Sequence, residues 1–205
     1  MLRSQLKNTL SIALVLAVSC ASALAQKTET VFGGATTVKL SGELVGALQS
    51  LGVKPGTVAP TKLFNGKVNF PVVAGAIDLQ TLKGEIIHSG GLTLSAGKTQ
   101  VRLQAFTIDT TGAAPILTGL VVKDGTLLGR VPLFDLDLSA SGIQLDEGVL
   151  KIKGVRLTLD KVAAGALNSF FGVSAFSRGF PIGTAKVLAV LDHCNDDCNG
   201  NEDNN

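Results

Sequence analysis

The stretch Phe70–Leu94, FPVVAGAIDLQTLKGEIIHSGGLTL, decides the fold of this chain. Its apolar residues form three short runs separated by a polar turn and by glycines, a pattern that predicts three consecutive β-strands. His88, one of only two histidines in the chain, ends the second run. An imidazole can accept or donate a hydrogen bond or bind a metal, and glycine backbone beside it leaves room for a ligand. We therefore predict a ligand site made of Ile86, Ile87, His88, Ser89, Gly90 and Gly91.

On both sides of this stretch the chain alternates apolar and polar residues in short runs, which predicts many further strands. The run 100–108 changes phase halfway and predicts a bulge. Two amphipathic segments predict short helices, the first after Ser41 and the second after Asp160, each followed by a glycine. Residues 26–35 and 53–62 are rich in polar residues, glycine or proline and predict loops. The expected fold is mainly β, an antiparallel β-sandwich or flattened barrel with two short helices.

An internal similarity links the two predicted helices. Val38–Val53, VKLSGELVGALQSLGV, resembles Val155–Val173, VRLTLDKVAAGALNSFFGV, and each runs from a strand through a helix to Gly-Val. Chance similarity between two amphipathic helices is the alternative. The interpretation that we keep is two equivalent strand–helix corners at the two ends of an antiparallel meander.

The first 25 residues have the pattern of an export signal. Arg3 and Lys7 precede an apolar run, and Ala23-Leu24-Ala25 form a small-residue cleavage site. The alternative is a lipid-modified Cys20. We expect a secreted or extracytoplasmic protein, periplasmic or at the cell surface, with a single domain at 26–191 and a polar acidic tail at 192–205. No stretch predicts a transmembrane segment.

Composition excludes several classes of function. Residues 26–191 carry 16 basic and 11 acidic side chains without clustering along the chain, so we expect no nucleic-acid partner. Phenylalanine is the only aromatic residue type, which argues against carbohydrate-binding platforms and removes tyrosine as a metal ligand.

The remaining polar motifs are weak. Cys194 and Cys198 are four residues apart and predict a small disulfide loop, with a metal site using His193 as the alternative. Asp135 and Asp137 share one face of a strand, as paired catalytic or cation-binding carboxylates would, but their alternation with apolar residues indicates a solvated strand face. No Gly-x-Ser-x-Gly motif is present. We therefore predict that the protein is not an enzyme.

The central block resembles the HtaA-type domain of exported bacterial proteins associated with haem uptake. The similar features are Phe70-Pro71-Val72, Ala74-Gly75, Gly84, His88-Ser89-Gly90 and the strand with Leu92 and Leu94. The later segment ALNSFFGVSAFSRGFPIGTAKV resembles the closing helix and strand of that family. The resemblance implies a β-rich fold and a haem cofactor, with a tyrosine binding the iron and a histidine supporting it.

This chain has no tyrosine, and the region that would supply it, near Leu44–Leu48, is aliphatic. The resemblance therefore implies either that His88 binds haem iron directly or that this is a relative without haem. We predict binding of haem or another hydrophobic or planar ligand near His88. The alternatives are a cell-surface interaction module with a protein partner and no small ligand, or a lipid carrier. An apolar cavity reaching the helices would favour lipid, an open groove at His88 haem, and a filled core the surface module.

Overall fold

The computed structural model describes residues 28–192. They form two helices and a single antiparallel sheet of twelve strands. Eight strands close into a barrel in the order β7-β5-β4-β1-β12-β11-β9-β8, with β8 pairing back onto β7. The prediction of a mainly β fold with two helices is confirmed. Of the two predicted architectures, sandwich and flattened barrel, the structure is a barrel. The strands are β1 (Thr28–Leu40), β2 (Lys54–Val58), β3 (Lys62–Phe64), β4 (Lys67–Asp78), β5 (Gly84–His88), β6 (Gly91–Ala96), β7 (Thr99–Asp109), β8 (Ile116–Lys123), β9 (Thr126–Asp137), β10 (Gly142–Asp146), β11 (Val149–Leu159) and β12 (Pro181–Leu191).

The sheet forks at two places where the backbone has positive φ. The first half of β7 pairs with β6 and its second half with β5, and Ala105, at φ +53°, lies in the irregularity between them. The bulge predicted within 100–108 is therefore confirmed. The second fork is on β11, which pairs first with β10 and then with β9, with Gly154 at φ +84° between the two ladders. The forks let β6 with β2, and β10, project from the closed barrel.

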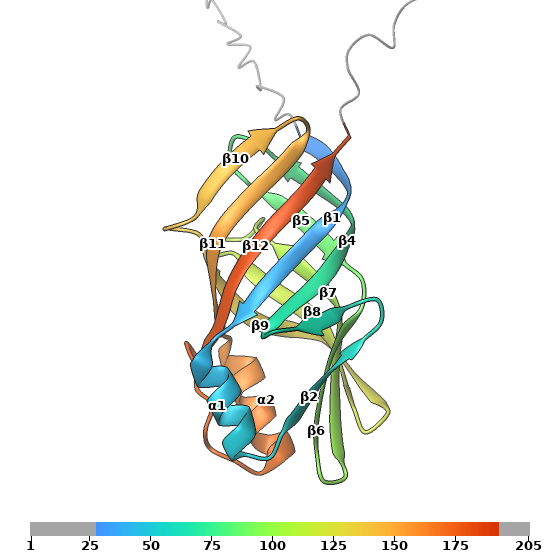
Figure 1. The fold of residues 1–205 in the computed structure, drawn as a ribbon, viewed down its shortest axis with the longest axis vertical. Helices are drawn as coiled ribbons and strands as arrows, with labels where there is room; N and C mark the ends of the chain where they lie inside the picture. Colours follow the sequence, from blue (N-terminus) through green and yellow to red (C-terminus); the bar gives the residue numbers. More distant parts are fainter. Residues whose placement is uncertain (1–27, 193–205) are drawn as a thin grey trace, which may run out of the picture.

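Both helices follow strands that flank β12. Helix α1 (Gly42–Ser50) begins where the Ser41 hydroxyl accepts a hydrogen bond from the amide of Leu44 at 3.0 Å. Helix α2 (Lys161–Phe171) begins with the Asp160 carboxylate accepting one from the amide of Val162 at 2.6 Å. Because β1 and β11 both pair with β12, the two strand–helix corners lie at one end of the barrel (Figure 1). The internal similarity thus corresponds to two equivalent corners, which are neighbours in space.

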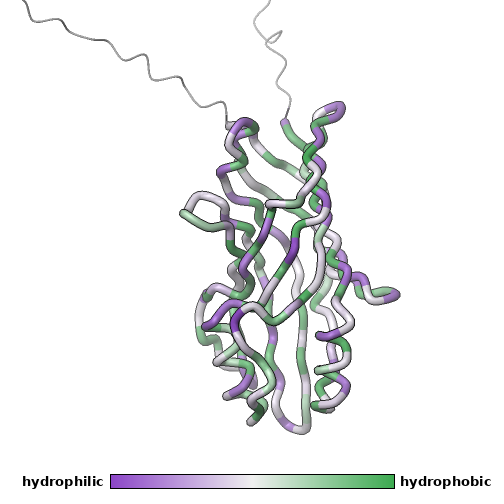
Figure 2. Tube along the Cα trace, turned by 90° about the vertical axis from the view of Figure 1, so that its left-hand side faces the viewer, coloured by the Kyte–Doolittle hydropathy of each residue, from purple (hydrophilic) through white to green (hydrophobic). Residues whose placement is uncertain are grey.

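The ladders around the barrel differ in length. β1 has nine paired residues with β12 and nine with β4. The β5–β7 ladder has three pairs, and the β9–β11 ladder has four. Hydrophilic and hydrophobic residues alternate along the strands (Figure 2), and the buried set includes Val38, Val68 and Val187 on the inner face of the barrel.

Two loop predictions were wrong. Residues 28–35 belong to β1, because their backbone pairs with β4 on one side and β12 on the other. Part of 53–62 forms β2 despite Pro55, since β2 pairs only with β6 and an edge strand tolerates proline. The predicted signal at 1–25 and the Cys194–Cys198 disulfide lie outside the described residues. Within residues 28–192, neither helix has the length and apolar character needed to cross a membrane.

Candidate functional site

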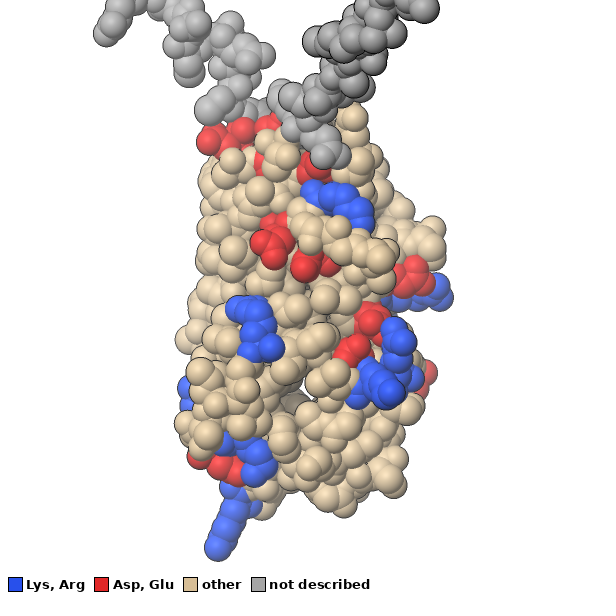
Figure 3. Space-filling model, turned by 180° about the vertical axis from the view of Figure 1, so that it is seen from behind, with Lys and Arg blue, Asp and Glu red and all other residues tan. Residues whose placement is uncertain are grey.

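An apolar cavity of about 120 Å³ runs from the barrel interior to the two helices. Its inner part is lined by barrel residues such as Phe70, Phe106 and Val187, and its outer part by residues of α1, α2 and β6. Pro55 on β2 and Leu63 on β3 are exposed and also line the cavity, so it opens to solvent beside these strands. The surface is hollowed in the lower, helix-bearing half of the back view (Figure 3). The other outer lining residues are Leu40, Leu44, Leu48, Leu92, Leu94, Ala163, Ala166, Leu167 and Phe170.

The only polar side chains in this lining are Thr36 on β1 and His88 on β5. Both are buried, each with 3 % of its surface exposed. The Nε2 atom of His88 lies 2.7 Å from the Thr36 hydroxyl oxygen, and its Nδ1 atom lies 3.3 Å from the carbonyl oxygen of Phe106. A carbonyl can only accept, so Nδ1 carries the proton and donates it, and Nε2 accepts a hydrogen bond from the Thr36 hydroxyl.

Burial controls the charge of this imidazole. Removal from water disfavours the protonated ring and lowers the pKa of His88 to about 4, while hydrogen bonds with the backbone of Phe106 and Ile86 oppose part of that shift. The ring is therefore neutral at pH 7. A neutral imidazole with both nitrogens hydrogen-bonded adds no charge to the cavity, whose surface is apolar.

The structure separates the other predicted site residues from the cavity. Ile86 is buried and lines a second, smaller void of about 30 Å³, while Ile87 points outward with 39 % of its surface exposed. The amide of Ser89 donates to the carbonyl of Pro71 at 3.0 Å. Of the six predicted residues, His88 alone lines the main cavity.

The two glycines after Ser89 are packed against neighbouring strands. Gly90 has φ +79°, and a Cβ there would lie 2.3 Å from the Thr61 hydroxyl oxygen. The same hydroxyl accepts a hydrogen bond from the amide of Gly91 at 2.9 Å. A Cβ on Gly91 would lie 2.2 Å from the carbonyl oxygen of Leu103. These positions require glycine because the protein itself fills the space beside them, so neither glycine leaves room for a ligand.

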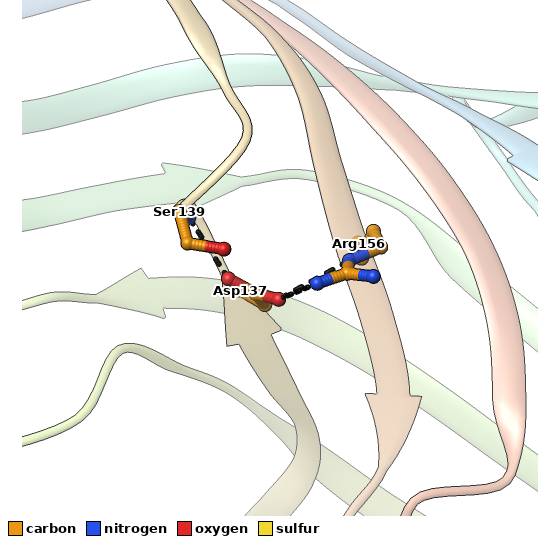
Figure 4. Close-up of polar contacts among 3 residues, drawn as sticks. All are labelled: Asp137, Ser139 and Arg156. Carbon is orange, nitrogen blue, oxygen red and sulfur yellow. Dashed lines mark hydrogen bonds and ion pairs between the residues drawn. The ribbon is translucent and has the colours of Figure 1, made fainter.

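The paired carboxylates of β9 are engaged in separate ion pairs on the surface. Asp137 binds the guanidinium of Arg156, whose Nε lies 3.1 Å from the carboxylate (Figure 4), and Asp135 binds Arg178 at 3.0 Å. Hydrogen bonds from Ser139 and then Arg156 lower the pKa of Asp137 to about 2. The interpretation as a solvated strand face is confirmed. Among residues 28–192 no cluster of three His, Cys, Asp or Glu side chains could hold a metal ion.

Sequence reasoning missed most of the cavity. Thr36 is 52 residues from His88 and belongs to an ordinary alternating strand, so nothing in the local pattern marks it as the partner of the imidazole. Phe70 and Phe106, whose rings meet edge to face at 5.1 Å, are 36 residues apart in sequence, and no local pattern predicts that they share a cavity. The helix residues carried a signal, because Leu44 and Leu48 on α1 and Ala166 and Phe170 on α2 lie one turn apart on apolar faces.

The fold and the site together define a class: a small antiparallel barrel with two helices at one end and an apolar cavity beneath them. Solved structures share this fold. The C-terminal domain of HtaA from Corynebacterium glutamicum is 16 % identical, with 80 % of this chain and 99 % of that chain covered and a TM-score of 0.64. The N-terminal domain of HtaA is 11 % identical, covering 78 % of this chain and 98 % of that one with a TM-score of 0.58.

The heme binding protein HtaB from the same organism is 9 % identical, covering 81 % of this chain and 96 % of that one with a TM-score of 0.52. No protein-family model matches the sequence, and no curated protein matches it significantly. The chain therefore has the HtaA-like domain fold. The resemblance seen in the central block is confirmed at the level of the fold.

Proposed function

We propose that this protein is a non-enzymatic carrier that binds an aliphatic or other apolar small molecule inside its barrel. The observation that carries the proposal is the cavity of about 120 Å³ with Thr36 and His88 as its only polar lining side chains. A cavity of about 150 Å³ with a purely apolar lining stays dry and binds a benzene-sized molecule. An apolar cavity that opens at Pro55 and Leu63 suits a ligand that places one apolar end inside and extends outward.

The cavity offers the ligand no charged group. The Thr36 hydroxyl donates its proton to His88, and the ring of His88 donates to the carbonyl of Phe106, so these polar groups satisfy one another. An anionic group of the ligand would meet no counter-charge inside the barrel. The preferred ligand is therefore neutral where it enters the barrel.

Haem is the second candidate, favoured by the fold shared with the heme binding protein HtaB. The residues present do not fit an iron site as they are arranged. The lone pair on Nε2 of His88, which would bind the iron, instead accepts a hydrogen bond from the Thr36 hydroxyl. The chain also has no tyrosine. In the HtaA-type resemblance a histidine supports a ligand hydroxyl, and here His88 holds the hydroxyl of a threonine instead.

The test is titration with a fluorescent fatty acid such as cis-parinaric acid. Ala166→Phe on α2 fills the outer cavity, and Val162→Phe on the same helix, where the side chain is 53 % exposed, is the matched control. We expect saturable binding that Ala166→Phe weakens at least tenfold and that Val162→Phe leaves unchanged. Absence of saturable binding, or equal binding by both variants, would refute the proposal.

A parallel haemin titration followed by absorbance decides the second candidate. A saturable Soret shift that His88→Ala abolishes would make haem the ligand and displace the aliphatic carrier. Absence of a shift removes haem, and a shift that His88→Ala leaves unchanged removes His88 as the iron ligand.

We further propose that the carrier acts outside the cytoplasm, which the signal pattern of residues 1–25 supports. Expression of the full chain in a bacterial host, followed by N-terminal sequencing of the exported protein, tests this. A mature terminus at Gln26 is expected, and retention in the cytoplasm with an intact N-terminus would refute export.

A further inference from the structure

Strand register gathers lysines that are distant in sequence onto one outer face of the barrel. Side chains on the inner face of β1 and β4, such as Val38 and Val68, are buried, so their neighbours Lys39 and Lys67 point outward. The same alternation turns Lys62 of β3, Lys153 of β11 and Lys186 of β12 outward. These strands lie side by side in the order β3-β4-β1-β12-β11, and the last four form the near face of the barrel in Figure 1. We call the surface made by Lys39, Lys62, Lys67, Lys153 and Lys186 the lysine face.

Two pairs within the lysine face oppose like charges. Lys39 is directly opposite Lys67 on the neighbouring strand, and Lys153 is directly opposite Lys186. Like charges in such positions destabilise a sheet, because the two Cβ atoms are only about 5 Å apart. The arrangement therefore opposes folding stability and calls for another explanation.

No carboxylate within residues 28–192 forms an ion pair with these lysines. The ion pairs within that part of the chain involve Lys123, Lys151, Arg156 and Arg178, and the ammonium of Lys153 donates a hydrogen bond to the side-chain amide oxygen of Gln144 at 3.5 Å. By contrast, the back of the molecule intersperses positive and negative side chains (Figure 3). The lysine face thus offers uncompensated positive charge to an anionic partner.

The β3–β4 hairpin adds an apolar tip to this charge. Phe64 is 74 % exposed, the largest fraction among the exposed large hydrophobic residues of the described chain. It pairs directly with Lys67 on the outer side of the hairpin, and Lys62 lies two residues before it. Leu63, on the opposite side of the same strand, lines the mouth of the cavity.

We propose that the lysine face and Phe64 dock this protein on an anionic lipid bilayer. Lysines within a Debye length of such a surface are attracted by it, and an exposed phenylalanine among them can enter the apolar boundary of the headgroups. Polyanions such as nucleic acid would satisfy the charge but would leave Phe64 without an apolar partner. The proposal concerns the outer surface and does not depend on which ligand the cavity takes.

Vesicle flotation tests the proposal with the purified protein and two lipid compositions. One vesicle is pure phosphatidylcholine, and the other contains about one-third phosphatidylglycerol. Each lysine near an anionic surface strengthens binding about fivefold, so Lys39→Gln with Lys186→Gln should weaken it about 25-fold. The matched control is Lys98→Gln with Lys161→Gln, which removes the same charge from the β6–β7 turn and the start of α2.

Phe64→Trp reports directly on the hairpin tip, because the chain contains no tryptophan. We expect binding to anionic vesicles only, loss of binding in the lysine-face variant but not in the control, and a blue shift of tryptophan emission with anionic vesicles. Equal binding to both vesicles, equal loss in both lysine variants, or an unchanged emission maximum would overturn the proposal. Lysine-dependent binding to a duplex oligonucleotide without vesicle binding would also overturn it and would make the face a nucleic-acid site. Because fatty-acid titration in solution is a separate measurement, failure of docking is distinguishable from failure of the carrier function.

Discussion

Acidification from pH 7 to pH 4 is expected to destabilise this protein chiefly through one buried side chain, His88. In the unfolded chain a histidine has a pKa near 6.5, whereas burial lowers the pKa of His88 to about 4 in the folded protein. Between these two values the unfolded state binds a proton that the folded state does not. The stability due to neutral His88 is therefore fully present above pH 6.5 and is lost as the pH falls towards 4.

The size of the loss follows from the shift. At about 1.4 kcal/mol per pH unit, a displacement from 6.5 to about 4 is worth about 3 kcal/mol of unfolding free energy. Carboxylates whose pKa hydrogen bonds lower, such as Asp78 and Asp137, add their own loss mainly below pH 4. The interval between pH 6.5 and pH 4.5 thus isolates the histidine.

Urea unfolding followed by circular dichroism at half-unit steps from pH 7.5 to pH 4.5 measures this slope. The chain contains one other histidine, so His193→Gln is the matched control for His88→Gln. We expect a steep fall in unfolding free energy for the wild type and for His193→Gln, and a nearly flat profile for His88→Gln at a lower overall stability. Parallel profiles for all three proteins would refute the assignment of a buried, neutral His88.

Three shorter predictions test the site and its surroundings. Thr36→Val leaves Nε2 of His88 without a partner and should lower the unfolding free energy by about 1–3 kcal/mol in urea titrations; an unchanged stability would contradict the hydrogen bond. Gly90→Ala forces a Cβ within 2.3 Å of a threonine oxygen at positive φ and should cost about 2–4 kcal/mol, against about 1 kcal/mol for Gly97→Ala, which has open space; equal melting temperatures would argue against this packing. Lys186→Thr removes a like-charge pair and should raise the unfolding free energy by about 0.2–1 kcal/mol at low salt, a gain that high salt abolishes.

Local patterns in the sequence predicted the elements of this fold well. Alternation identified most of the strands, and Ser41 and Asp160 marked both helix starts because a side-chain oxygen caps the first turn. The phase change within 100–108 predicted the bulge that lies at the fork of β7. Each of these features depends on residues close together in the chain.

Features that depend on strand register could not be predicted in this way. The contact of Thr36 with His88 joins β1 to β5 across the intervening strand β4, and the opposition of Lys153 with Lys186 depends on the register of β11 against β12. Charge counted along the chain showed no clustering, although the folded surface gathers five lysines. Barrel closure itself depends on the ladder between β7 and β8. Alternation of apolar and polar residues is the same in a barrel and in a sandwich, so it does not predict this ladder.

The uneven ladders of the barrel have a consequence for its dynamics. The β5–β7 ladder has three pairs and the β9–β11 ladder has four. These two short ladders divide the barrel into a five-stranded part, β5-β4-β1-β12-β11, and a three-stranded part, β7-β8-β9. Opening free energies are lowest where the fewest hydrogen bonds must break together. Amide hydrogens along these two seams should therefore exchange with solvent first, and those of β1 and β12 last. Separation of the two groups of strands along these ladders would widen the barrel interior without unfolding either group. Such a motion would admit ligands larger than the cavity of the closed barrel.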